Sequence, residues 1–363
     1  MLLEITLKEK FSGLRAVTYF KVVFGSPSKF FILFGMIVGL IFVITSPPGF
    51  GLDERAHFMR TYLISSGQFL PQRLPVTNEV GAYLPLNLVQ FVGASTKDIL
   101  DNNTARFFVN RHDTDLTVYK PFFLQPFSKE KVNDYSTNNQ LLATLAYSPF
   151  GYLHMATATK VIRLLDAPMI YAMYLSRFVN LVLYLVLIYW AIKVIPRYKW
   201  LLVGIGLLPT AIFQASSMSL DPFVTGLSVV ATAYAVKFWL AKRRSITTKD
   251  VLIVVCVFVG IALIKTPYIC LLLLFLGLPS NRFISRTTAY MVKTTWLTLT
   301  MVFTLGWVYI NRSITPSLVL LQPGHADVAE QIRFIISKPI DVTGIIIKTH
   351  YESIDHTLAS FNR

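Results

Sequence analysis

The sequence has few charged residues and few cysteines, and each shortage excludes a class of protein. Charged residues make up 15% of the 363 positions and hydrophobic residues 54%, whereas soluble proteins carry about 25% charged residues. This composition excludes a soluble single-core fold and a disordered chain, and it predicts an integral membrane protein. Cys256 and Cys270 both lie in apolar runs, so we interpret them as small core residues, which excludes a disulfide framework or a zinc site.

Motifs for common cofactors are also missing. The sequence contains no Walker loop, dinucleotide glycine fingerprint, serine nucleophile elbow or HExxH motif. Chemistry driven by ATP or a nicotinamide cofactor is therefore not expected. Several histidines lack metal-ligand spacing and are interpreted as surface or interface residues; they are His112, His154, His325, His350 and His356.

Long apolar runs are present, and a membrane-spanning helix needs roughly 20 such residues. We expect about seven transmembrane helices, at residues 30–46, 169–192, 200–218, 222–241, 251–264, 268–278 and 289–310. The first run is followed by Pro47-Pro48-Gly49 without the small-residue cleavage pattern of a signal peptide. It is therefore expected to remain as an anchor.

The net charge of +15 is unevenly distributed. With a cytoplasmic N-terminus, the inner segments 1–29, 193–199, 237–250 and 281–293 hold 16 Lys and Arg residues and three acids. The long segment 47–140 holds nine of each sign. The excess of basic residues on one side predicts an inner or plasma membrane protein with several passes and a cytoplasmic N-terminus, and it argues against nucleic-acid binding.

Two segments allow more than one topology. Residues 251–278 form either two short spans or one helix kinked at Thr266-Pro267, and two spans keep Arg282 and Arg286 on the basic side. Residues 141–165 contain Pro149 and several polar residues, and we interpret them as an interfacial helix.

The expected organisation is all-α. It comprises a basic cytoplasmic N-terminus (1–29), the first transmembrane helix (30–46), an extracytoplasmic loop with juxtamembrane helices (47–168), the remaining bundle (169–310) and an extracytoplasmic C-terminal segment (311–363).

This topology brings four ionisable residues to the outer membrane surface: Asp53, Glu54, Asp221 and Lys265. Asp53 and His57 are four positions apart, so they share one face of a helix that reaches residue 65. Asp53 is either a helix N-cap or a general base assisted by Glu54 or His57. A divalent cation such as Mg²⁺ or Mn²⁺ is an optional ligand of this cluster.

Other candidates have structural and functional interpretations. Asp221 before Pro222 is an ordinary helix start. Lys265, three positions before Tyr268, either extends its ammonium to the membrane surface or binds a phosphate. The same two interpretations apply to Arg177. Aromatic residues in the loop either stack on sugars or form an interfacial belt, which is the default; they are Tyr83, Phe107, Phe108, Tyr119, Phe122, Phe123 and Tyr135.

Five motifs in order resemble those of the bacterial domain of unknown function 2142 family. They are Pro47-Pro48 through Asp53-Glu54-Arg55-Ala56-His57-Phe58, Tyr147 through Leu153, Ser176-Arg177-Phe178-Val179-Asn180, Leu207-Leu208-Pro209 with Ser217 through Pro222, and Ile264 through Tyr268. The resemblance covers roughly residues 30–355. That family is similar to polytopic glycosyltransferases of the C-type fold, which use polyprenyl-phosphate sugars.

The resemblance implies catalytic roles for Asp53, Glu54 and Asp221 and a phosphate contact for Lys265. Leu52 and Arg55 stand where the family commonly has proline around the acidic pair. The family also usually continues beyond the region of His350, so a shortened C-terminus is expected.

The resulting hypothesis is sugar transfer from a polyprenyl-phosphate donor to an envelope glycan or a lipid-linked acceptor. Asp53 acts as base, and Lys265 with Arg60 or Arg177 stabilises the leaving phosphate, while Tyr268 and His57 contribute to substrate binding. The alternatives are a lipid-linked glycan transporter or flippase, which is disfavoured because few charges lie deep in the spans, and a noncatalytic subunit of a polysaccharide assembly complex.

Overall fold

The computed structural model describes residues 25–70, 72–73, 80–101, 116–134, 144–312 and 328–361. The chain divides into two compact units, Met1–Ile314 and Thr315–Arg363. The interpretations given for five residues cannot be compared with the structure, because the residues lie outside the described ranges; they are Phe107, Phe108, His112, Tyr135 and His325.

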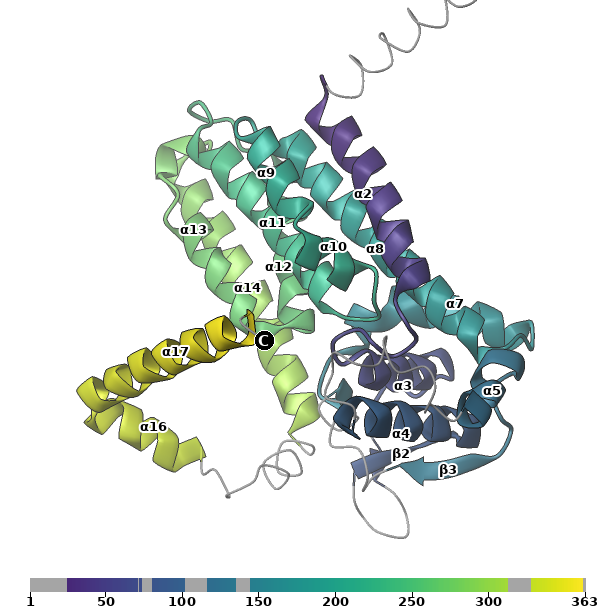
Figure 1. Ribbon diagram of the computed structural model, residues 1–363. Helices are drawn as coiled ribbons and strands as arrows, with labels where there is room; N and C mark the ends of the chain where they lie inside the picture. The colour runs from purple at the N-terminus through teal and green to yellow at the C-terminus, as the bar shows by residue number, and fades with distance from the viewer. Residues whose placement is uncertain are drawn as a thin grey trace, which may run out of the picture. The chain divides into compact units, whose positions relative to one another are not determined.

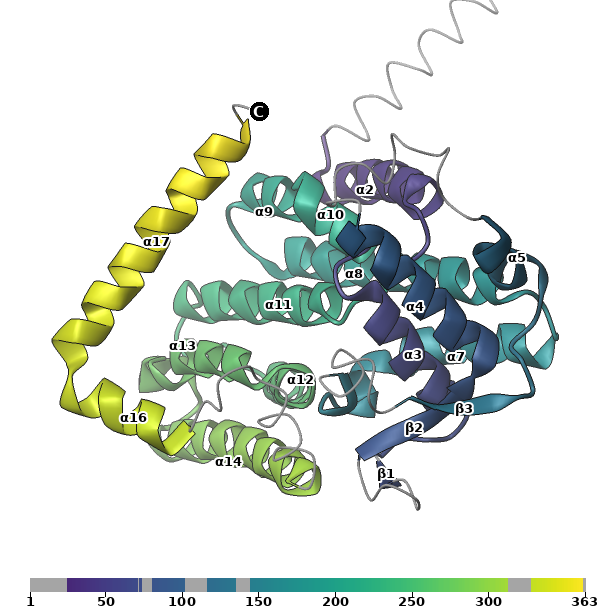
Figure 2. The ribbon, with the colours of Figure 1, turned by 60° about the horizontal axis from the view of Figure 1, so that its bottom comes forward.

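The first unit is built on a helix bundle. Its segments are α2 (Pro27–Thr45), α8 (Met169–Val194), α9 (Lys199–Gly206), α10 (Pro209–Ala215), α11 (Asp221–Trp239), α12 (Thr248–Ile264), η2 (Thr266–Leu272), α13 (Leu273–Leu276) and α14 (Arg286–Asn311). Helices α2, α8, α11, α12 and α14 pack one against the next, as Figure 1 and Figure 2 show. Every expected apolar run therefore falls on helical structure.

The segments alternate in direction between two ends of the bundle. We call one the Asp53 end, where Thr45, Met169, Asp221 and Ile264 lie, and the other the arginine end, where Pro27, Val194, Trp239 and Arg286 lie. At the arginine end the rings of Phe30 and Trp200 are 5.6 Å apart. At the Asp53 end the Asn180 amide donates to the carbonyl of Ser217 at 2.8 Å.

The chain reverses direction at Lys265, so the segment 251–278 forms two helical stretches. Lys265 pairs with Asp221 at the Asp53 end, whereas the Trp239 indole donates to the Leu274 carbonyl at 3.0 Å near the other end. The return stretch begins as a 3-10 helix, which rises about 2.0 Å per residue against 1.5 Å in an α-helix. A short apolar run therefore covers more of the bundle's length than an α-helix of equal size.

The run expected as one span over 200–218 is instead two short helices. Helix α9 ends at Gly206 and α10 starts at Pro209. Proline lacks the N–H that would continue the helix and forces an extended conformation on the preceding residue, and Leu208 has a ψ of 132°. The expectation of a continuous helix here is corrected.

The described chain is mostly helical, as expected, but the loop between α2 and α8 also contains a small sheet that the all-α prediction did not include. Strands β1 (Gln72–Arg73), β2 (Val80–Pro85) and β3 (Lys131–Asp134) pair antiparallel in the order β1-β2-β3. The accompanying helices are α3 (Glu54–Ser65), α4 (Leu86–Asp101) and α5 (Leu116–Leu124). Figure 1 shows α3, α4, β2 and β3 gathered at one end of the bundle.

This loop region has its own apolar core. The rings of Phe91 and Phe122 stack with centroids 3.9 Å apart, and both side chains are buried. Phe58 approaches Phe122 edge-on at 6.3 Å. Phe122 is therefore a core residue, which corrects its assignment to an interfacial aromatic belt, while Phe123 remains exposed.

The segment expected as one interfacial helix over 141–165 starts later. A 3-10 turn, η1 (Pro149–Tyr152), leads into α7 (Leu153–Leu164), and residues 141–143 are not described. Helix α7 packs against α8 and α3. It thereby connects the loop region to the bundle.

Two described helices are long and apolar enough to cross a membrane, α2 and α8, by the criteria of length and composition. The stretch Thr266–Leu276 is apolar but shorter. In the second unit, α16 (Val328–Ser337) contacts α17 (Pro339–Phe361), and large apolar side chains of both, such as Ile336 and Ile340, are exposed.

Glycines allow α2 to approach α8 closely. A Cβ at Gly39 would lie 2.5 Å from Leu181 Cδ1, and one at Gly35 would lie 2.6 Å from Leu185 Cδ2. These glycines are four residues apart, the spacing of small residues that brings helices together in membranes. The contact between the first and second long apolar helices therefore depends on the absence of side chains at both positions.

Gly39→Val should destabilise the protein by about 1–3 kcal/mol, because the added methyl groups overlap the buried Leu181. Thermal unfolding of the detergent-solubilised protein measures the effect. Gly306→Val is the control, since no atom lies within 4 Å of a Cβ at that exposed position. Equal melting temperatures for the two variants would contradict the proposed close contact.

Candidate active site

A fully buried ion pair lies at the Asp53 end of the bundle. The Glu54 carboxylate, at the start of α3, meets the Arg177 guanidinium of α8 at 2.6 Å, and both side chains have 0% exposure. A second hydrogen bond joins Arg177 Nε to Glu54 Oε1 at 2.7 Å. The contact is therefore bidentate, the strongest geometry for an arginine and a carboxylate.

Both partners of this pair have their hydrogen-bonding capacity filled. The remaining three N–H groups of Arg177 point to carbonyl oxygens of Val43, Ser46 and Pro47 at 3.3, 2.7 and 2.8 Å. Glu54 also accepts from the backbone N–H of Gly51 at 3.2 Å and of Met218 at 3.0 Å. Arginine has five N–H donors and a carboxylate accepts about four hydrogen bonds, so neither group has a free position for a substrate.

The ion pair joins four segments of the chain. Arg177 binds the end of α2, while Glu54 binds the turn before α3 and the turn between α10 and α11. This arrangement needs a glycine at position 51, where a Cβ would lie 2.6 Å from the Cβ of Ser217. Glu54 and Arg177 therefore hold the site together.

Asp53, the neighbour of Glu54, has the opposite environment. Its side chain is exposed and makes no hydrogen bond to the α3 N–H groups. Its backbone is left-handed, with φ of 54° and ψ of 15°, a conformation that aspartate tolerates better than most residues. The N-cap interpretation of Asp53 is therefore corrected, because its carboxylate caps nothing.

His57 lies one turn into α3 and is nearly buried. Its Nδ1 is 2.8 Å from the Tyr152 hydroxyl of η1, and no partner of its Nε2 is found among the described residues. Burial lowers the pKa of His57 to about 4, although the nearby charges of Asp221 and Asp53 oppose this shift. Burial likewise raises the pKa of Tyr152 well above its ordinary value, so both groups are neutral near pH 7.

Asp221 and Lys265 form a second ion pair beside His57. Their side chains are 29% and 27% exposed, and Asp221 also accepts from the Gln214 amide at 2.6 Å. Burial by itself would lower the pKa of Lys265, but the hydrogen bond and charge of Asp221 outweigh it and raise the pKa. The ammonium therefore stays charged, and its exposed part keeps donors available.

Tyrosines surround this second pair. The Lys265 ammonium lies 6.0 Å from the ring centroid of Tyr147. Tyr268, whose backbone N–H donates to the Lys265 carbonyl at 3.2 Å, is 38% exposed. The cluster thus combines one exposed carboxylate, a neutral imidazole, a partly exposed ammonium and phenol groups within one end of the bundle.

Arg60, which the sequence suggested as a substrate contact, is buried. Its side chain is fully buried on α3 and donates from Nη2 to the Phe69 carbonyl at 2.8 Å and to the Tyr147 carbonyl at 3.4 Å. Its Nε and Nη1 have no hydrogen-bond partner among the residues that the structure describes. Burial lowers the pKa of Arg60 to about 10, so it remains charged near pH 7.

Asn180 and His154, which the sequence did not suggest as site residues, join the site to the bundle. The amide of Asn180 donates to the carbonyls of Ser217 and Ser219 at 2.8 and 3.1 Å. Its Oδ1 lies 2.9 Å from His154 Nε2. His154 is half-buried and is a structural partner of Asn180 between α7 and α8.

The donors do not fit a bound divalent cation. Glu54 is saturated and Asp221 is paired with Lys265. Among the residues that the structure describes, no group of three or more His, Cys, Asp or Glu side chains could hold a metal ion.

Comparison of the sequence with known protein families identifies the family of this chain. A profile described as predicted membrane protein matches residues 36–361. The chain belongs to the domain of unknown function 2142 family. No curated protein and no solved structure matches it significantly.

Family membership and the apolar helices α2 and α8 together identify a membrane protein. The five motifs on which the resemblance was based converge at the Asp53 end, apart from Leu207-Leu208-Pro209, where Leu207 lies beside Gly35 midway along α2. Their polar residues make the contacts described above, through Glu54 and His57, Tyr152, Arg177 and Asn180, the backbone of Ser217 to Ser219, and Lys265.

The expected roles of several residues change with these contacts. Arg177 neither extends to the membrane surface nor has a donor left for a phosphate, and Glu54 has no lone pair left to act as a base. Tyr152 was not chosen as a candidate from the sequence, although it stands inside one of the five motifs.

Breaking the buried pair should cost about 3–5 kcal/mol of stability, because the remaining charge is left buried and unpaired. Glu54→Gln and Arg177→Met are the variants, and thermal or denaturant unfolding in detergent is the measurement. Lys237→Met is the control: it breaks an ion pair with a 39% exposed lysine and should cost about 1 kcal/mol or less. Similar losses for both pairs would contradict the structural role.

Stability should fall between pH 7 and pH 5 by about 2 kcal/mol on account of His57. Its pKa is about 4 in the folded protein and 6.5 when unfolded, so below pH 6.5 the unfolded chain takes up a proton that the folded chain does not. His57→Gln should flatten this part of the pH–stability curve. His350→Gln, on an exposed residue of α17, should leave it unchanged; an unaltered curve in His57→Gln would refute the assignment.

Proposed function

We propose that this protein is a membrane glycosyltransferase that moves a sugar from a polyprenyl-phosphate donor to an envelope glycan or a lipid-linked acceptor. Its resemblance to C-type glycosyltransferases supplies the reaction class. Among the described residues, the exposed carboxylate of Asp53 forms no hydrogen bond or ion pair, and it lies beside two acids that are saturated or paired; this observation carries the proposal.

The reaction takes place at the extracytoplasmic side in this proposal. The arginine end of the bundle bears the basic segments 193–199, 237–250 and 281–293, and basic loops favour the cytoplasm. The alternating segments then give a protein with several passes in the inner or plasma membrane, a cytoplasmic N-terminus and the Asp53 end outside.

Asp53 is the base of the proposed transfer. Of the three acids in the cluster, Glu54 accepts four hydrogen bonds and Asp221 binds Lys265 and Gln214, so Asp53 is the one with free lone pairs. It takes the proton of an acceptor hydroxyl as that oxygen attacks the anomeric carbon. The left-handed backbone of Asp53 sets the direction in which its side chain extends from the chain.

Lys265 receives the leaving group. As the bond between the anomeric carbon and the phosphate oxygen breaks, both electrons stay on the polyprenyl phosphate, and the ammonium stabilises the added charge. Asp221 keeps Lys265 protonated and in place. Tyr268 and the Nε2 side of His57 are the further contacts for substrate, and no step requires a metal ion.

Asp53→Asn should abolish transfer while the protein still reaches the membrane. Asparagine keeps the shape and tolerates the left-handed backbone, but it cannot accept the proton. The measurement is the sugar composition and linkage of purified envelope glycans from a deletion strain that carries wild-type protein, the variant or an empty vector. The variant should lack the same sugar as the deletion strain.

Asp166→Asn is the matched control, because Asp166 is also exposed and left-handed, with φ of 51°, but lies in the α7–α8 turn. It should restore the glycan. Restoration by Asp53→Asn as well would remove Asp53 from the chemistry and leave a transporter or a noncatalytic subunit of an assembly complex as the better account.

A further inference from the structure

A second polar feature lies at the arginine end of the bundle, away from the Asp53 cluster. A cavity of about 550 Å³ is formed by the α11–α12 connection, the 3-10 turn η3 (Ser280–Arg282) and the first turn of α14. Its polar lining includes Arg243, Arg244, Asn281, Ser280, Arg286 and Tyr290. We call it the arginine pocket.

The walls of the arginine pocket are fixed by their own hydrogen bonds. The backbone N–H of Arg244 donates to the Asn281 carbonyl at 3.1 Å, and that of Ser245 donates to the Arg282 carbonyl at 3.1 Å. The Arg282 guanidinium donates to the carbonyls of Trp239, at 3.0 Å, and Ala241. Arg282 is thus occupied with joining the end of α11 to η3, and the pocket exists without a ligand.

The three arginines that line the pocket have no such role. Among the described residues, the guanidinium groups of Arg243, Arg244 and Arg286 form neither a hydrogen bond nor an ion pair, and no carboxylate lines the cavity. The neighbouring acid, Asp250, is bound to Lys237 at 2.6 Å and to Thr247. Arg243 and Arg286 are like charges at this hollow that repel each other, and a bound anion would relieve that repulsion.

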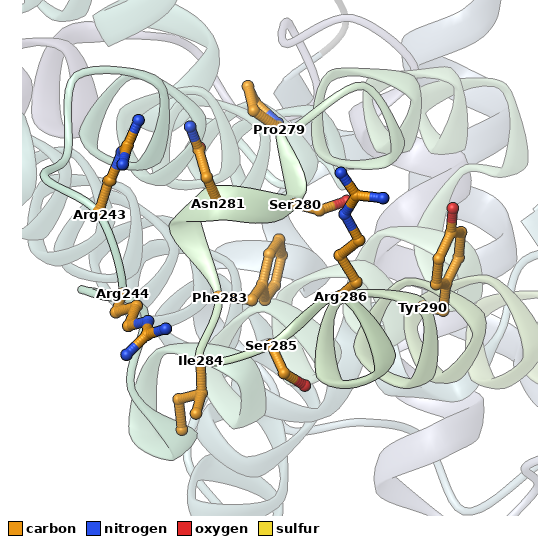
Figure 3. Close-up of a pocket in the computed structure, with 10 residues that line it drawn as sticks. All are labelled: Arg243, Arg244, Pro279, Ser280, Asn281, Phe283, Ile284, Ser285, Arg286 and Tyr290. Carbon is orange, nitrogen blue, oxygen red and sulfur yellow. The ribbon is translucent and has the colours of Figure 1, made fainter.

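The other lining groups suit an anion that carries several oxygens. Figure 3 shows the side chains of Arg243, Asn281, Arg286 and Tyr290 extending to the same side of η3, whereas Arg244 points to the opposite side. The amide and hydroxyl groups supply neutral donors. The 26-residue helix α14 begins at Arg286 and adds the partial positive charge of its N-terminus.

The rim of the pocket has the character of a membrane interface. Ile284 is 66% exposed and Tyr290 68% exposed, and the half-exposed Trp239 lies on the adjoining end of α11. Basic pockets with aromatic and apolar rims at the ends of membrane helices bind the headgroups of anionic lipids.

We propose that the arginine pocket binds a phosphate group, supplied either by the headgroup of an anionic membrane lipid or by a soluble phosphate. Arg243 and Arg286 hold the phosphate oxygens by charge-assisted hydrogen bonds, and Asn281 and Tyr290 complete the shell. This site is independent of sugar transfer, since it uses no residue of the Asp53 cluster.

The test compares the full-length purified protein with a triple variant, Arg243→Gln/Arg244→Gln/Arg286→Gln. Thermal stability is measured while phosphatidylglycerol is titrated into phosphatidylcholine nanodiscs. Phosphatidylglycerol should stabilise the wild type, and the half-saturating mole fraction should rise at least tenfold in the variant. Inorganic phosphate is titrated separately: stabilisation by phosphate at millimolar concentration, without any effect of the lipid, assigns the site to a soluble phosphate.

A second triple variant removes equal charge from the same end outside the pocket, Lys193→Gln/Arg197→Gln/Lys199→Gln. It should respond to the ligand like the wild type. A third, Arg243→Lys/Arg244→Lys/Arg286→Lys, keeps the charges that direct membrane insertion and should still bind more weakly than the wild type, because lysine lacks the planar fork of arginine.

Three results would overturn the proposal. The first is that the control variant outside the pocket loses as much binding as the triple glutamine variant of the pocket. The second is that phosphatidylcholine alone stabilises the wild type as much as phosphatidylglycerol does. The third is that both pocket variants have the same half-saturating ligand concentration as the wild type.

Discussion

The arrangement of the Asp53 end depends on one buried ion pair, that of Glu54 and Arg177. A charged pair without water is stable only where every donor and acceptor is satisfied, and here the additional partners are backbone groups of three separate turns. The end of α2, the start of α3 and the α10–α11 turn therefore cannot move independently. Each neighbouring side chain takes its position from this fixed frame.

Adjacent acids in this frame have opposite chemistry. Glu54 is enclosed and has no free lone pair, whereas Asp53 is exposed and has no protein partner in the described residues. The backbone at Asp53 is left-handed, with φ of 54°, and Glu54 is the first residue of α3. A pair of carboxylates that looks symmetrical in the sequence is thus divided into a structural member and a reactive member.

Apolar run length and the distribution of basic residues predicted the helical segments and the convergence of Asp53, Asp221 and Lys265 at one end. These features follow from local composition. The ion pair between Glu54 and Arg177 could not be predicted from local composition, because the two residues are 123 positions apart and only packing brings them together. The break before Pro209 was readable from the sequence, but this signal is short beside the long apolar runs.

The distance along the chain between Glu54 and its partners has a consequence for biogenesis. A ribosome adds about 5–20 residues per second, so the 123 positions between Glu54 and Arg177 take roughly 6–25 s to synthesise. The N–H of Met218 arrives later still. During this interval α2 is followed by a carboxylate without its counter-ion. Assembly of the site is therefore a late event, completed only after the chain has emerged beyond the α10–α11 turn.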